Sequence, residues 1–349
     1  MKIPVLLISN FLSASGGSRG VCEELAIRLA ENGAPVITAS KKTARLPRLV
    51  DMLGTALFQR EKYSVAHVDV FSGSAFFWAE ATCAMLRLLR KPFILTLHGG
   101  NLPEFAELHP ARVRRLLSSA KIVTVPSCYL LKKMSPYRSD LHLVVNALDT
   151  AHCSFHLRTV ANPSLVWLRS FHEIYNPSLA PKVLKLLSEK FPDIQLTMVG
   201  PDKNDGSLDR VIRTATELCV LDRICFQRGV EKRDVPKWMQ RGDVFLNTTN
   251  VDNTPVSVLE AMACGLCVVS TDVGGLPYLL KDEHDALLVP PDDAPKMAEA
   301  VERVLTDSTL AQKLSQNARN KAEDHDWSVV LPQWEEIFLS LTNRNSTPQ

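Results

Sequence analysis

The stretch TTNVDNTPVSVLEAMACGLCVVSTDVGG, residues 248–275, decides the fold class. It predicts a loop that contains Asp252, a helix that begins at Pro255, a strand, and a closing Gly-Gly pair. Proline suits the first helical turn, where its missing N–H needs no partner, and Thr254 before it is a typical N-cap. A second acid, Glu260, falls on the second helical turn. The order strand, loop, helix, strand is typical of an α/β fold.

Short apolar runs alternate with amphipathic helical segments along the rest of the chain. The first series is IPVLLIS, APVITAS, VAHVDVF, PFILTLHGG and KIVTVPS, and the second is SLVWLRS, IQLTMVG, ICFQRG, DVFLNTT and CVVSTD. This alternation predicts two tandem doubly wound Rossmann-like α/β domains with parallel sheets that face a cleft. We place the domains at residues 1–155 and 156–326, with a C-terminal helix at about 327–342 that could pack back on the first domain.

Composition bounds the function. The chain has 349 residues, 46% hydrophobic and 22% charged, which is ordinary for a globular protein. A formal net charge of +2 argues against a nucleic-acid partner, since such domains usually carry a strong basic excess. Apolar runs stay below the roughly 18 residues that a membrane-spanning helix needs. Eight scattered cysteines fit free thiols and a cytoplasmic location.

Metal and dinucleotide sites are poorly supported by the sequence. Cys264 and Cys267 form a CxxC pair without the second pair that a structural zinc site needs. The GGSRG segment lacks the G-x-G-x-x-G arrangement of dinucleotide-binding folds. Asp324 and Asp326 lie near the C-terminus, where a solvated charge cluster is the simpler interpretation.

Residues 252–260 suggest what kind of ligand the chain binds. A helix that starts at the carboxyl edge of a sheet favours negative charge at its N-terminus. An ionised carboxylate on the second turn, such as Glu260, only accepts hydrogen bonds and therefore suits a pair of hydroxyls. Both features together fit a ligand that has a diphosphate and a diol.

The same stretch resembles the donor-binding signature of family 4 retaining glycosyltransferases of the GT-B fold. That signature is an acid, seven residues, a Glu, then A-M-A-x-G-x-x-V-V and a Gly-Gly pair. VWLRSFHEIYNP is similar to the family's G-R motif and places Arg169 there, and LTLHGGNLPEF places His98 at the family's cleft histidine. SASGGSRG is similar to the first Gly-rich loop. The resemblance keeps the motif order over nearly the whole chain.

The resemblance implies transfer of a sugar, with retention, from a nucleotide-diphosphate sugar to an acceptor hydroxyl, as in cell-surface polysaccharide or glycolipid synthesis. It implies that Glu260 holds the ribose diol, Asp252 the donor sugar and Arg169 the leaving diphosphate, with His98 near the reacting carbon. His98, Arg169 and Asp252 are thus the catalytic candidates. No metal and no cofactor besides the donor are expected, because an arginine and a helix terminus supply positive charge. The further donor-binding candidates are Gly16, Gly17, Lys203, Arg228, Gly229, Asn253, Thr254 and Val256.

Three departures from the family pattern leave alternatives open. The first acid is Asp252 rather than Glu, Pro255 replaces a Gly, and Ile174 stands where a Lys is common. Lys203 could supply the missing charge. The alternatives are a nucleotide-sugar-binding protein without turnover and a GT-B nucleotide-sugar epimerase, for which only His98 is an evident acid/base group. The nucleotide, UDP or GDP, is not readable from the segment around Arg228.

The acceptor, a glycan or a lipid-linked molecule, is expected to meet the first domain. A basic segment between His109 and His142 suggests peripheral contact with the inner face of a membrane. The simpler interpretation is that these cations solvate helix faces. They are Arg112, Arg114, Arg115, Lys121, Lys132, Lys133 and Arg138, against the single acid Asp140.

Overall fold

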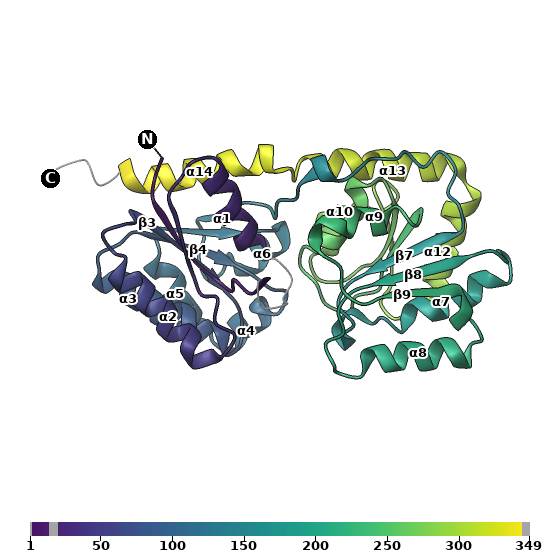
Figure 1. Ribbon diagram of the computed structural model, residues 1–349, viewed down its shortest axis with the longest axis horizontal. Coiled ribbons are helices and arrows are strands. Elements are labelled where there is room, and N and C mark those ends of the chain that lie inside the picture. The colour runs from purple at the N-terminus through teal and green to yellow at the C-terminus, as the bar shows by residue number, and fades with distance from the viewer. Residues whose placement is uncertain (1, 14–19, 344–349) are drawn as a thin grey trace. The chain divides into compact units, whose positions relative to one another are not determined.

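The computed structural model describes residues 2–13 and 20–343. The chain divides into two compact units, Met1–Ala147 with Trp327–Gln349, and Leu148–Asp326. Residues 148–155, which the sequence analysis assigned to the first domain, therefore lie in the second unit. The C-terminal helix α14 (Trp327–Asn343) belongs to the first unit, where it lies beside α1 (Val21–Glu31) (Figure 1).

The first unit is built on a six-stranded parallel sheet in the order β2-β1-β3-β4-β5-β6. Its strands are β1 (Val5–Ile8), β2 (Val36–Ala39), β3 (Val65–Val70), β4 (Phe93–Leu97), β5 (Ile122–Val125) and β6 (Leu141–Leu143). Besides α1 and α14 its helices are α2 (Arg45–Phe58), α3 (Ala75–Leu88), α4 (Leu102–Leu108), α5 (Pro110–Ser119) and α6 (Cys128–Met134).

Helices cover both faces of this sheet. Successive strand residues point to opposite sides and therefore pack against different helices. Leu6 and Ile8 of β1 belong to the hydrophobic cluster that α2 to α6 complete. Val5 and Leu7 belong to the cluster that α1 and α14 complete. Strands buried on both faces read as continuous apolar runs, which is why the alternation of runs and helices predicted this class of sheet.

The second unit repeats the plan with a six-stranded parallel sheet in the order β12-β11-β10-β7-β8-β9. Its strands are β7 (Ser164–Leu168), β8 (Gln195–Val199), β9 (Ile224–Gln227), β10 (Val244–Asn247), β11 (Cys267–Thr271) and β12 (Leu287–Val289). Its helices are α7 (Leu179–Ser188), α8 (Ser207–Glu217), α9 (Val235–Met239), α10 (Val256–Ala263), α11 (Leu276–Leu279), α12 (Ala294–Thr306) and α13 (Ser308–Glu323).

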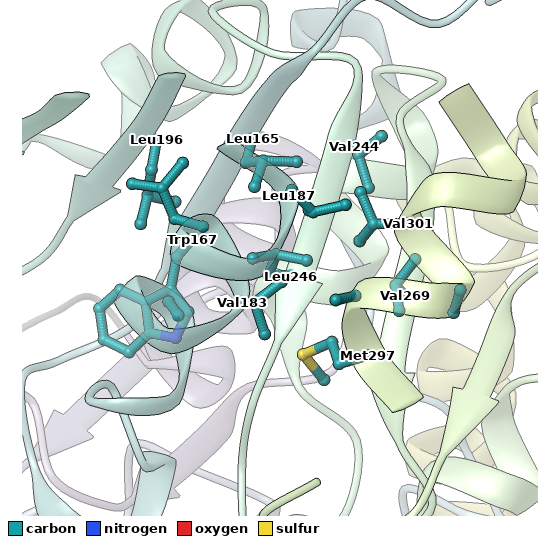
Figure 2. Close-up of a cluster of buried hydrophobic side chains, with 14 of the residues drawn as sticks. Leu165, Trp167, Val183, Leu187, Leu196, Val244, Leu246, Val269, Met297 and Val301 are labelled. Carbon is teal, nitrogen blue, oxygen red and sulfur yellow. The ribbon is translucent and has the colours of Figure 1, made fainter. Parts of the chain in front are cut away.

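The core on one side of the second sheet is a dense set of aliphatic side chains around Trp167 (Figure 2). Leu165 and Leu246 of neighbouring strands meet Val183 of α7 and Met297 of α12 there. The buried indole N–H of Trp167 donates a hydrogen bond to the Thr248 hydroxyl at 2.9 Å, so that its polar atom is satisfied. The two parallel sheets with flanking helices confirm the predicted α/β doubly wound class.

Each sheet has a point at which the order of its strands reverses. In the first unit β2 and β3 flank β1, and in the second unit β8 and β10 flank β7. Ligands of doubly wound sheets bind beyond the carboxyl ends of the strands at such points. Within residues 2–13 and 20–343, no helix combines the length and apolarity needed to cross a bilayer.

Candidate functional site

Four adjacent strands of the second unit bring most of the predicted residues to one sheet edge. Asp252 follows β10, Arg169 follows β7, Lys203 follows β8, and Arg228 with Gly229 follows β9. Because all four strands are parallel, their carboxyl ends meet at the same edge. Residues from four separate segments of sequence are thereby gathered beside the reversal between β7 and β10.

Arg169 and Asp252 meet at that reversal. The Arg169 guanidinium donates a hydrogen bond to the Asp252 carboxylate, and both side chains are largely buried. The Arg169 Cζ lies 4.2 Å from the centroid of the Tyr175 ring, which is a close cation–π contact. The Nε of Arg169 is buried without a hydrogen-bond partner among the described residues. A buried donor of this kind would gain from an incoming anionic acceptor.

The Gly-Gly pair of the opening stretch holds the loop that carries Asp252. The Gly275 N–H donates to the Asp252 carbonyl at 3.0 Å. A Cβ on Gly274, whose φ is +56°, or on Gly275 would collide with the backbone carbonyls of Asp252 and Asn253. Only glycine allows the two backbone segments to approach this closely. The Asn253 N–H in turn donates to Asp252 Oδ1 at 2.8 Å, and this fixes the carboxylate.

Helix α10 begins at Val256, one residue later than predicted. Pro255 precedes it with φ −70° and ψ 120°, which is an extended conformation, so Thr254 is not the N-cap. Proline tolerates both positions, and sequence alone did not separate them. Glu260 is half-buried on this helix. The first turn also carries Ser257, whose buried hydroxyl has no hydrogen-bond partner within the described part of the chain and which the sequence analysis did not single out.

The loop after β8 is tied to the loop after β7. The Phe171 N–H donates to the Pro201 carbonyl at 2.9 Å, and the Lys203 N–H donates to the Phe171 carbonyl at 3.2 Å. Gly200, with φ +153°, has no room for a Cβ, which would collide with the Arg169 carbonyl. Gly200 therefore lets the backbone of Arg169 pack directly against the end of β8. Its signal in the sequence is the glycine that directly follows the apolar run QLTMV of β8.

In the first unit His98 follows β4 and is oriented by a buried acid that the sequence analysis missed. His98 Nε2 lies 2.9 Å from Asp69 Oδ1, and the Ser9 hydroxyl donates to the other carboxylate oxygen. Burial raises the pKa of Asp69, but the charge and hydrogen bond of His98 outweigh it and hold that pKa below its usual value. The signal was an acidic residue inside the buried run VAHVDVF. Asp69 on β3 and Ser9 after β1 lie at the strand-order reversal of this sheet.

A second buried histidine, His67, lies next to this pair. Its Nε2 is 2.5 Å from the Thr96 hydroxyl, and its Nδ1 is 3.7 Å from the Cys22 sulfur. Burial lowers the pKa of His67 to about 4, so the ring is neutral at neutral pH. Cys22, His67 and Asp69 have potential metal-ligand atoms within 4.8 Å of one another, yet hydrogen bonds already join each of them to a neighbour. The absence of a metal requirement stays a prediction.

The other predicted positions are less informative. Gly16 and Gly17 lie outside the described residues. In the basic segment, Arg112 pairs with Glu80 through two hydrogen bonds of 2.5 and 2.8 Å. Arg138 binds Asp140 and the carbonyls that end α5. Two of the cations expected to face a membrane therefore serve the fold.

Solved structures of other proteins share the fold of these two units. Sucrose-phosphate synthase from Thermosynechococcus elongatus superposes with a TM-score of 0.80 at 17% identity, over 98% of this chain and 100% of that one. The Anabaena protein Alr3699/HepE in complex with UDP-glucose superposes with a TM-score of 0.74 at 16% identity, over 97% and 99%. This chain therefore has the GT-B fold of two Rossmann-like units.

Sequence comparison finds similarity to a family over part of the chain. Residues 162–321 match the model of Glycosyl transferases group 1. The D-inositol 3-phosphate glycosyltransferase of Paenarthrobacter aurescens is 24% identical over 76% of this chain and 69% of that protein. The phosphatidyl-myo-inositol mannosyltransferase of Mycolicibacterium smegmatis is 29% identical over 46% and 40%. Other curated relatives are matched over 13% to 63% of their length, which is less than two thirds.

Proposed function

We propose that this chain is a retaining glycosyltransferase that moves a sugar from a nucleotide-diphosphate sugar to an acceptor hydroxyl in cell-surface glycan or glycolipid synthesis. The observation that carries the proposal is the meeting of Arg169 and Asp252 at the β7–β10 reversal, beside the start of α10. Both residues fall in the segment 162–321 that matches Glycosyl transferases group 1.

The proposed donor site uses three kinds of contact. Arg169 and the N-terminus of α10 would bind the diphosphate, because both present N–H donors and positive charge. Glu260 would accept hydrogen bonds from the ribose diol, and Asp252 with Asn253 would bind the sugar. The pairing of Arg169 with Asp252 means that a bound diphosphate competes with a carboxylate for the guanidinium. The UDP-glucose in the HepE structure supports UDP over GDP.

The proposed chemistry is electrostatic. Negative charge develops on the leaving diphosphate. Each preorganised hydrogen-bond donor there can lower the activation free energy by about 3 kcal/mol. Arg169 and Lys203 would supply them, so that no metal or further cofactor is needed. The leaving phosphate would accept the proton of the acceptor hydroxyl on the same face of the sugar. His98, held by Asp69, would contact the donor sugar.

A second candidate is a protein that binds a nucleotide sugar without turnover. It is favoured by Ile174 at the position of the usual lysine and by the engagement of Arg169 with Asp252. The epimerase alternative gains the His98–Asp69 pair as an acid/base group. Product analysis separates the three: transfer releases nucleoside diphosphate, epimerisation changes the sugar, and simple binding does neither.

A thermal-shift screen of UDP, GDP, ADP and their sugar conjugates tests the donor site. A ligand at about 100 times its dissociation constant should stabilise the folded state by about 2.7 kcal/mol. Glu260→Ala should abolish the shift, whereas Glu217→Ala, an exposed acid on α8, should keep it. Equal thermal shifts in both variants would show that Glu260 does not contact the nucleotide. No thermal shift in the wild type would refute nucleotide binding.

A further inference from the structure

Helix α2 is apolar on both of its faces: Met52 and Ala56 on its inward face are buried in the core of the first unit. Its inward face carries the buried Arg48, whose guanidinium binds the Lys42 and Thr43 carbonyls and the Asn10 side chain at 2.7 to 2.9 Å. Its outward face also carries large apolar side chains: Leu46 is 76% exposed, Val50 68% and Phe58 80%. The outward face of a helix at a water-exposed surface normally carries polar and charged side chains.

The neighbouring helix α3 extends the same apolar surface. Phe77 is 53% exposed and Leu88 is 78% exposed, and Ala81 and Ala84 lie between them at helical spacing. Helices α2 and α3 pack side by side on the sheet face opposite to α1 and α14 (Figure 1). A cation–π contact of 5.1 Å between Arg48 and Trp78 fixes one helix to the other.

Positive charge borders this apolar surface. Residues 41–62 and 75–91 contain nine Lys and Arg against three acids, whereas the whole chain has a net charge of only +2. Of the acids, Glu80 is neutralised by Arg112. The cations flank the two helices rather than interrupt their outward faces: Lys41, Lys42 and Arg45 at the start of α2, Arg60 and Lys62 after its end, and Arg87, Arg90 and Lys91 at the end of α3. Two of them also have partners within the unit, because Arg60 pairs with Glu61 and Lys91 donates a hydrogen bond to the Tyr63 carbonyl.

We propose that the outward faces of α2 and α3, the apolar face hereafter, rest on the surface of an anionic lipid bilayer. Apolar side chains ringed by Lys and Arg are the chemistry with which a helix lies in the interface of such a membrane. The bordering cations bind anionic headgroups while Leu46, Val50 and Phe58 enter the acyl boundary. This surface differs from the basic segment 109–142 that the sequence suggested.

The helices that carry the apolar face also contribute, from their inward sides, to the functional edge of the first unit. A cavity beside β1 and β3 is lined by Ser9 and Asp69 and by Met52 of α2 and Trp78 of α3. A lipid-linked acceptor held in the bilayer would therefore meet the side of the unit that carries Asp69 and His98. This last link rests on the proposed function, whereas membrane contact itself does not.

Co-sedimentation of the full chain with vesicles tests the proposal. Vesicles of phosphatidylcholine alone are compared with vesicles that also contain phosphatidylglycerol, at low and high salt. We expect the protein to pellet with the anionic vesicles, and less at high salt because headgroup contacts are screened. The triple variant Leu46→Ser, Val50→Ser, Phe58→Ser should reduce the bound fraction at least about tenfold.

Two further variants locate the surface. Leu186→Ser with Leu221→Ser removes exposed apolar side chains of the second unit and should leave binding unchanged. Lys132→Glu with Lys133→Glu probes the basic segment and should have the smaller effect. The proposal is overturned if the wild type binds neither kind of vesicle, or if the triple variant binds as well as the wild type. It is also overturned if binding is lost only in the variant with Lys132→Glu and Lys133→Glu.

Two readouts distinguish membrane contact from self-association of the chain and from misfolding of the variant. Light scattering shows whether the apolar face instead joins two copies of the chain: a wild-type dimer that the triple variant converts to a monomer, without vesicle binding, overturns the proposal. The nucleotide thermal shift should survive in the triple variant, which shows that it is folded. If the wild type does not bind a nucleotide sugar, the proposed function is refuted and the membrane result still stands.

Discussion

At the scale of single residues, Arg169 has three neighbours that together determine its use. The Asp252 carboxylate neutralises it, the Tyr175 ring stacks against it, and its Nε remains an unsatisfied donor within the described structure. Tyr175 follows Ile174, the position at which the resemblance to family 4 glycosyltransferases led us to expect a lysine. In this chain an aromatic ring therefore orients the arginine at the place where a second cation is absent.

Replacing Tyr175 tests that role. Tyr175→Leu should weaken binding of the nucleotide about three- to tenfold, since an exposed to partly buried cation–π contact contributes about 1 kcal/mol. Tyr175→Phe keeps the ring and should bind like the wild type. Titration calorimetry measures both, and equal affinity in the leucine variant would show that the ring does not position Arg169.

The buried His67 should make the stability of the protein depend on pH. Its pKa is about 4 in the folded protein against 6.5 for the free side chain, because it is buried. Between these values the unfolded chain binds more protons, so the free energy of unfolding falls as pH falls, by up to about 3 kcal/mol. Asp69, whose pKa is below its ordinary value of 3.8, acts only at still lower pH.

Chemical denaturation from about pH 7 to about pH 4.5 measures this loss. In His67→Gln the same acidification should cost less stability, because a glutamine does not titrate. An identical pH dependence in the two proteins would mean that other groups govern acid stability.

At the scale of elements, the sequence predicted more of the second unit than of the first. The strand–loop–helix order around Asp252 was legible because Pro255, Glu260 and the closing glycines mark it. The start of α10 was misplaced by one residue, since Pro255 suits both positions. Asp69 was missed because an acid inside a buried run does not reveal its partner, and its pairing with the loop after β4 is a tertiary contact. The exposed apolar face of α2 was equally hidden, because periodicity does not say which apolar residues of a helix stay exposed.

The Gly-Gly pair gives a prediction for the loop that carries Asp252. Gly275→Ala should destabilise the protein by about 1 to 3 kcal/mol and abolish nucleotide binding, because its Cβ displaces the Asn253 carbonyl. Gly54→Ala, in the middle of α2 with room for a Cβ, should instead stabilise by about 0.5 to 1 kcal/mol. Thermal unfolding and titration measure both, and unimpaired binding in Gly275→Ala would contradict the proposed packing.

At the scale of the whole molecule, the chain returns to the first unit after completing the second. Helix α14 places Trp327, Trp334 and Phe338 against Leu7 of β1 and Leu25 of α1 in one buried cluster. Part of the covering of one face of that sheet thus comes from residues more than 300 positions away from β1. The sequence indicated a helix here but not its depth of burial.

Trp334→Ala should therefore destabilise the first unit by about 3 to 5 kcal/mol through the cavity that it leaves. Val329→Ala, on the exposed side of the same helix, should cost no more than about 0.5 kcal/mol. Denaturant unfolding compares the two. Similar small losses in both variants would mean that α14 is not part of this core.

The proposed function depends above all on Arg169 binding the diphosphate of a nucleotide sugar at the β7–β10 reversal. The decisive measurement is titration calorimetry of UDP and GDP into the wild type, Arg169→Gln and Arg213→Gln, Arg213 being an exposed arginine on α8. We predict one-to-one binding of one nucleotide, at least about tenfold weaker in Arg169→Gln and unchanged in Arg213→Gln. No binding to the wild type, or full affinity in Arg169→Gln, would contradict this role of Arg169.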